Sequence, residues 1–149
     1  MPDVHPPETR SRNMAAIHAV NTKPELLIRR QLHAKGYRYR LHARNLPGKP
    51  DMVFQKFSAV IFIHGCFWHR HNCHLFRWPQ THTDFWNNKL NNNAERDQRN
   101  QVVLSEAWRV GIIWECALRG RNRMDIEDVT NQIDDWLQSD GRSLLVSSK

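Results

Sequence analysis

The sequence predicts one α/β domain in which helices flank a mixed sheet. Its 149 residues are the usual length of a single domain and suffice for a hydrophobic core. Helical and strand-like apolar patterns follow one another in the order ααβββαβα, which is typical of a mixed sheet with helices packed against it. The chain contains no run of about 18 apolar residues, so we expect no membrane span.

The first half of the chain is expected to form two helices and three strands. Three prolines among the first twelve residues predict an irregular arm before a short helix. The second helix is better marked, because Thr22 can cap it, Pro24 suits its first turn and Gly36 ends it. The short helix is expected over 11–19, and strands are expected over 37–41, 51–54 and 59–64.

The second half is expected to add a long helix, a strand and a final helix. Thr83 is predicted to cap the long helix, which would bury Trp86 and Leu90. The run VGIIWE predicts the strand, and an apolar stripe with acidic residues around it predicts a helix over 125–139. Residues 140–149 are expected to form a frayed, flexible tail.

Positive charge is concentrated near the N-terminus. Residues 1–49 hold ten Lys or Arg and three acidic residues, whereas the other 100 residues hold twelve of each, so the formal net charge of +7 comes from the first third. Such a cluster suits a polyanion, because Lys and Arg neutralise phosphates and release counterions. We therefore expect residues 1–20 to be a DNA-binding arm. On charge alone, a solvated basic face is an equal alternative.

A pattern of metal ligands lies in residues 65–82, a segment without apolar periodicity. Cys66, His71 and Cys73 have the spacing C-x4-H-x-C, and Cys116 at the end of a later strand can complete a tetrahedral zinc site. If the strands before Cys66 and Cys116 lie side by side, their ends bring all three thiols together. Metal binding would then order the segment, because it contributes directly to folding.

Other interpretations of these residues stay open. Cys66 and Cys116 could be buried apolar residues, and His69 or His74 could replace His71 as the ligand. We prefer His71, because His69 suits the catalytic role described below. Three cysteines cannot all pair, and the N-terminus lacks the apolar centre of a signal peptide, so we expect a reducing, cytoplasmic location.

An acidic residue and two histidines suggest nuclease chemistry. Asp51 opens one predicted strand, and the neighbouring strand ends at Ile63 and His64. Many phosphodiesterases hold Mg²⁺ on a scissile phosphate with a carboxylate beside an adjacent strand end. The common arrangement has an acid and a lysine on that second strand, so here a main-chain carbonyl and the imidazoles of His64 and His69 would have to serve. Taken singly, Asp51 could be a turn residue and His64 a hydrogen-bonded strand-end residue.

Five ordered motifs resemble one family. The motifs are RSRNMAAI, LPGKPD, VIFIHGCFWHRHNC, TDFWNNKLNNNAERD and WRVGIIWECALRGR, and the match is collinear from about Asp3 to Trp136. Together they closely resemble the very short patch repair (Vsr) endonucleases, bacterial enzymes that nick mismatched DNA. The resemblance implies a restriction-endonuclease-like α/β fold with a structural zinc, whose ligands here would be Cys66, His71, Cys73 and Cys116.

The resemblance also implies a catalytic set. Asp51 and the main-chain carbonyl of Ile63 would bind Mg²⁺. His64 and His69 would act on the phosphate and the attacking water, and Glu25 would lie behind His69. The family cuts one strand on the 5′ side of the thymine in a T:G mismatch, which arises when 5-methylcytosine deaminates. Well-known members have Thr where this chain has Ile63, so any role of that hydroxyl would be lost.

Recognition residues are implied in the aromatic segment, the Asn-rich segment and the N-terminal arm. A T:G pair stacks less well than a matched pair, so inserting aromatic rings beside it costs less. Lys and Asn can hydrogen-bond to the edges of a wobble pair. The rings could instead be core residues, and the polar residues an exposed helical face. The residues concerned are Phe67, Trp68 and Trp86 for the wedge, Lys89 and Asn93 for reading the mismatch, and Met14 for the arm.

The sequence therefore predicts a Mg²⁺-dependent endonuclease that nicks double-stranded DNA containing a T:G mismatch. Two other functions stay open: a non-enzymatic, zinc-organised module that binds damaged DNA, and a restriction-type nuclease that cuts matched duplex. We expect a monomer, because the sequence shows no spare apolar stripe. As a DNA-binding protein it is expected at the bacterial nucleoid. Contact with mismatch-repair proteins is left open.

Overall fold

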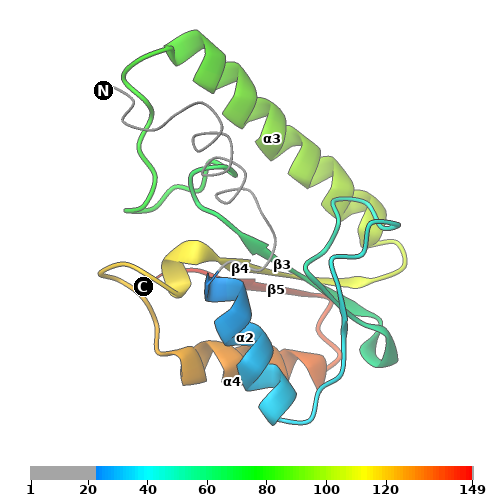
Figure 1. The fold of residues 1–149 in the computed structure, drawn as a ribbon. Coiled ribbons are helices and arrows are strands. Elements are labelled where there is room, and N and C mark those ends of the chain that lie inside the picture. Colours follow the sequence, from blue (N-terminus) through cyan, green and yellow to red (C-terminus); the bar gives the residue numbers. More distant parts are fainter. Residues whose placement is uncertain (1–22, 149) are drawn as a thin grey trace, which may run out of the picture.

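The computed structural model describes residues 23–148, which form a five-stranded sheet with helices on both faces (Figure 1). The strand order is β1-β2-β3-β4-β5. Neighbours are antiparallel from β1 to β3 and parallel from β3 to β5, so the sheet is mixed, as predicted. The strands are β1 (Arg40–Leu41), β2 (Met52–Phe54), β3 (Ala59–His64), β4 (Arg109–Trp114) and β5 (Ser143–Val146).

The helices divide between the two faces of the sheet. Two of them, α2 (Lys23–Ala34) and α4 (Ile126–Leu137), pack together on one face, and the long α3 (Thr83–Leu104) lies over the other (Figure 1). Short 3-10 helices follow β2 and β4, namely η1 (Gln55–Phe57) and η2 (Glu115–Ala117). Among the described residues, none of the helices has the length and apolar character needed to span a membrane.

Alternation along β3 builds a core on each face of the sheet. Ala59 and Ile61 face α2 and α4, whereas Val60 and Phe62 face the side of Leu104 in α3. Successive side chains of a strand point to opposite faces, and a strand that is buried on both faces reads as one continuous apolar run. The two cores therefore hold β3 in place. Its last residue, His64, lies at the end of the strand, where the candidate site begins.

The predicted strand over 37–41 is longer than the observed one. β1 contains only Arg40 and Leu41. Tyr37 is buried instead, and its hydroxyl hydrogen-bonds to Asp134 of α4. The aromatic alternation in this stretch therefore reflects packing against helices and not pairing along a strand.

Two further expectations need correction. Thr83 does not cap α3 but is its first residue, and His82 before it has a left-handed φ of 52° and makes no side-chain capping bond. Residues 143–146 are not frayed, because they form β5 parallel to β4, with Val146 buried. That pairing depends on an edge of β4 that only the folded sheet supplies. The predicted helix over 11–19, together with Met14 and Thr22, lies outside the described residues.

Candidate metal centres and nuclease site

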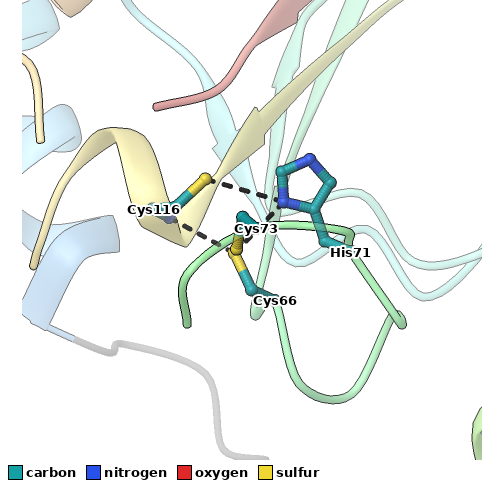
Figure 2. A group of neighbouring side chains, drawn as sticks. All are labelled: Cys66, His71, Cys73 and Cys116. Carbon is teal, nitrogen blue, oxygen red and sulfur yellow. Dashed lines mark hydrogen bonds between the residues drawn. The ribbon is translucent and has the colours of Figure 1, made fainter. Parts of the chain in front are cut away.

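Three cysteines and a histidine meet at one end of the sheet (Figure 2). Parallel pairing of β3 with β4 sets His64 opposite Trp114, so Cys66 and Cys116, each two residues further on, emerge side by side. The loop after Cys66 returns His71 and Cys73 to the same place, and the four ligand atoms all lie within 4.8 Å of one another. The Nδ1 atom of His71 lies 3.5 Å from the Cys66 sulfur and 3.6 Å from the Cys116 sulfur.

The surroundings of this cluster suit a bound metal ion. Cys66 and Cys116 are fully buried, and main-chain N–H groups donate to the sulfurs, as at Ser148, which lies 3.2 Å from the Cys116 sulfur. Without a metal ion, burial raises the pKa of the Cys66 thiol, and the other two thiols add to the rise. A bound metal ion would offset this effect, because its positive charge favours the thiolate. Burial lowers the pKa of His71, which keeps the imidazole neutral, as a ligand must be.

The two competing histidines are held elsewhere. His69 Nδ1 hydrogen-bonds to Asp97, and His74 packs against Gly120, where a Cβ would lie 2.6 Å from its Nε2 atom. The ring of His71, in contrast, stacks on Trp114 with centroids 4.0 Å apart and planes 7° apart, which directs Nδ1 at the sulfurs. The four residues proposed from spacing are therefore the ones that the fold brings together.

A second cluster lies on the α2 side of the sheet and contains two carboxylates. Asp51 Oδ2 accepts a hydrogen bond of 2.6 Å from the Ile63 N–H. Glu25, in the first turn of α2, lies 2.8 Å from His42 Nε2 and 3.2 Å from an Arg29 nitrogen. Ligand atoms of Glu25, His42 and Asp51 lie within 4.8 Å of one another. Burial raises the pKa of Asp51 to about 8, and although the Ile63 N–H opposes the rise, the negative charge of Glu25 adds to it. Two carboxylates so close together are a suitable place for a divalent cation.

A third cluster follows directly along β3. The rings of His64 and His69 stack with centroids 3.9 Å apart and planes 7° apart, and His69 Nδ1 bonds to Asp97 on α3. Burial lowers the pKa of His64 well below its ordinary value, and the imidazoles of His69 and His71 add to the drop. His64 is therefore neutral near pH 7, and the carboxylate of Asp97 holds the ring of His69 in one orientation.

Comparison with known proteins identifies the family. A family model described as DNA mismatch endonuclease Vsr matches residues 2–75. The DNA mismatch endonuclease Vsr of Escherichia coli (strain K12) is 43% identical over 150 residues, which cover 100% of this chain and 96% of that protein. The chain belongs to the Vsr family. This finding confirms the resemblance seen in the five sequence motifs.

Two other relatives of this Vsr-family chain are described as type II nicking enzymes. V.XorIIP of Xanthomonas oryzae pv. oryzae is 44% identical over 119 residues, which cover 79% of this chain and 88% of that protein. V.NmeAIP of Neisseria meningitidis serogroup A is 42% identical over 122 residues, which cover 81% of this chain and 87% of that protein. The relatives thus include both a mismatch endonuclease and nicking enzymes.

The expected partner of His69 needs correction. Glu25 does not lie behind His69, because its carboxylate bonds to His42 and Arg29 on the α2 side of the sheet. Asp97 holds His69 instead. Asp97 is the last residue of the motif TDFWNNKLNNNAERD, but nothing in the sequence indicates its role, because its contact with His69 depends on where α3 lies relative to the end of β3. His42 was missed for the same reason, since its neighbours are set by the turn between β1 and β2.

The three aromatic residues expected to form the wedge in this Vsr-family chain contact one another, and Phe67 directly follows Cys66 of the Cys/His cluster. Phe67 lies 5.0 Å from Trp68 and 5.3 Å from Trp86, measured between ring centroids, and the two Trp rings are 5.7 Å apart. All three are half-buried. The sequence pattern suggested that Trp86 is a core residue. It is instead half-buried and part of this group.

The two polar residues expected to read the mismatch differ in exposure. Lys89 is exposed. Asn93 is 8% exposed, and its amide donates to the Trp68 carbonyl at 3.1 Å and accepts from Arg96 at 3.0 Å. Asn93 is therefore not part of an exposed reading surface in this structure, because its side chain ties α3 to the aromatic segment.

Replacing His71 with Gln tests the Cys/His cluster. The variant loses one of the four ligands, so we expect bound metal to fall well below the about one ion per chain expected of the unaltered protein, and the thermal midpoint of unfolding to fall with it. Metal analysis by mass spectrometry after dialysis measures the first effect. His74→Gln is the matched control and should keep its metal. Full metal content in His71→Gln would contradict the ligand assignment.

Proposed function

We propose that this protein is a Mg²⁺-dependent endonuclease that nicks one DNA strand on the 5′ side of the thymine in a T:G mismatch produced by deamination of 5-methylcytosine. The main support is that the acidic cluster (Glu25, His42 and Asp51) and the imidazole cluster (His64, His69 and Asp97) both involve the end of β3. Asp51 accepts from the Ile63 N–H, and His64, which stacks on His69, is the next residue. A candidate cation site and a candidate proton acceptor at the end of one strand are the groups that phosphodiester hydrolysis needs.

The acidic cluster would hold the cation. We assign Asp51 and the main-chain carbonyl of Ile63 as ligands, with Glu25 beside them. When bound there, Mg²⁺ would stabilise the charge that develops on the scissile phosphate. The like charge of Glu25, which helps to raise the pKa of Asp51, favours such an ion.

The imidazole cluster would handle the proton and the phosphate. His69 Nδ1 is engaged by Asp97, so its Nε2 atom is the one left to accept a proton from the attacking water. His64 is held neutral by burial, and we assign it a hydrogen bond to the phosphate and not an ionic contact. Asp97 would keep His69 in the required tautomer and orientation, as a carboxylate does for a catalytic histidine in other hydrolases.

The Cys/His cluster and the aromatic group would recognise the mismatch together. Zn²⁺ suits a Cys₃His ligand set, and we propose that it is structural here. It would hold the loop that carries Phe67 and Trp68, and these rings with Trp86 would enter the poorly stacked T:G step. Lys89 would read the mismatch, whereas Asn93 would brace Trp68. The N-terminal arm with Met14 and the basic first third would bind the duplex.

One assay tests this function against the two alternatives. Zinc-loaded protein is incubated with Mg²⁺ and either a T:G duplex or the matched duplex, with each strand labelled. We expect a nick in the thymine strand of the T:G duplex and no cut in the matched duplex. Binding without cleavage would indicate a non-enzymatic module, and a double-strand cut of matched DNA would indicate a restriction-type nuclease. Either outcome would overturn the proposal.

Replacing Asp51 with Asn should abolish nicking and yet stabilise the cation-free protein. Because the folded-state pKa of about 8 exceeds the usual value of about 4, the partly buried carboxylate destabilises the fold increasingly as pH rises between these values. Thermal unfolding in the absence of divalent cations should therefore show a larger stabilisation of Asp51→Asn at pH 8.5 than at pH 4.5. The exposed Asp140→Asn is the control. Equal effects of Asp51→Asn at both pH values would contradict the burial argument.

Replacing Asp97 with Asn tests the base. Asn cannot stabilise the charged imidazole, so we expect the single-turnover nicking rate to fall about 10²- to 10⁴-fold, the usual contribution of general-base catalysis. Binding of the T:G duplex, measured by gel shift, should change little. Glu95→Gln, at an exposed position of the same helix, serves as the control. An unaltered rate in Asp97→Asn would remove the His69–Asp97 pair from the mechanism.

A further inference from the structure

His42 has no part in the function proposed above, yet its backbone conformation is unusual. It follows β1 with a left-handed φ of 49°, which is uncommon for a residue other than glycine and recurs at functional sites. Its main-chain N–H donates to the Asp51 carbonyl at 3.1 Å. This bond therefore ties His42 to the residue directly before β2, and the imidazole of His42 lies in the acidic cluster.

The imidazole of His42 has the position of a ligand. Its Nε2 atom lies 2.8 Å from Glu25 Oε2, and both belong to the group whose ligand atoms, with that of Asp51, lie within 4.8 Å of one another. Around a six-coordinate ion with bonds of about 2.1 Å, adjacent ligand atoms lie about 3 Å apart. The His42–Glu25 separation therefore fits two neighbouring positions on one cation as well as it fits a hydrogen bond.

Charge balance does not require His42 as a partner of Glu25. Arg29 already supplies a positive charge 3.2 Å from the same carboxylate oxygen. The side chain of Glu25 is 3% exposed, whereas that of His42 is 20% exposed. The imidazole is thus the more accessible member of the pair.

We infer that His42 is a side-chain ligand of the catalytic cation, which makes the site a mixed carboxylate–imidazole centre that binds Mn²⁺ more tightly than Mg²⁺. The inference rests on the proposed cation-dependent cleavage at Asp51. Imidazole nitrogen suits transition ions, whereas Mg²⁺ prefers oxygen ligands. On binding, Nε2 coordinates the ion through its lone pair, so the neutral imidazole carries its proton on Nδ1, and a proton held between Nε2 and Glu25 moves to Nδ1 or, from a charged imidazole, to solvent.

Electron paramagnetic resonance with Mn²⁺ on the zinc-loaded full chain tests this assignment without any cleavage step. Pulsed measurements detect the ¹⁴N nucleus of a directly bound imidazole, and a titration of free Mn²⁺ gives the dissociation constant. We expect ¹⁴N coupling in the unaltered protein. In His42→Gln the coupling should vanish and Mn²⁺ affinity should fall about 10-fold or more, with a smaller loss for Mg²⁺ measured by competition. His33→Gln, exposed in the last turn of α2, is the control and should change neither.

The other outcomes of this experiment distinguish the assignment of His42 as a ligand from the proposed nicking function. Mn²⁺ binding without ¹⁴N coupling, unaltered coupling in His42→Gln, or equal losses for both ions would overturn the assignment of His42 as a ligand. Asp51→Asn should abolish the coupled Mn²⁺ signal, and its persistence would also count against the site. A protein with the coupling that does not nick a T:G duplex would contradict the proposed function and leave the cation site standing. A protein that nicks the T:G duplex but shows no ¹⁴N coupling would contradict the assignment of His42 as a ligand and leave the proposed function standing.

Discussion

The parallel pairing of β3 with β4 is the constraint on which the rest of this structure depends. Its register sets His64 beside Trp114, so the residues that follow the two strands leave the sheet side by side at the same end. Cys66 and Cys116 consequently meet although 50 residues separate them in the sequence. Trp114 also supplies the surface on which His71 stacks. A change of register in this pair would dismantle the Cys/His cluster and displace the end of β3 that carries Ile63 and His64.

The same strand end carries groups that oppose folding. Asp51 is partly buried, and its desolvation, with the charge of Glu25, raises its pKa. The buried His64 has a Nδ1 atom without a hydrogen-bond partner among the described residues. Such groups persist where the surrounding structure is rigid enough to hold them. Here the apolar runs of β3 and β4, buried on both faces of the sheet, provide that rigidity. The apolar residues along β3 thus stabilise the fold, whereas the residues at its end belong to the candidate site.

Sequence alone predicted the parts that depend on local pattern. The helices at α2 and α4, the buried strands and the Cys/His set all follow from spacing, and the Cys116 ligand needed only the assumption that two apolar strands are neighbours. Asp97, His42 and β5 could not be predicted, because each depends on a distant partner: the end of β3, the carboxylate of Glu25 and the free edge of β4. The pairing of Glu25 with His69 was wrong for the same reason. Motif resemblance named both residues but did not specify which face of the sheet each one occupies.

Amide hydrogen exchange across residues 65–82, with the metal bound and after its removal, tests the central claim most directly. That claim is that strand register and a metal ion together order a segment with no apolar pattern of its own. Metal removal should raise exchange throughout 65–82 and leave the β2–β3 amides protected, because the two apolar cores remain. Equal protection of 65–82 in both states would show that packing alone orders the segment and would contradict the account.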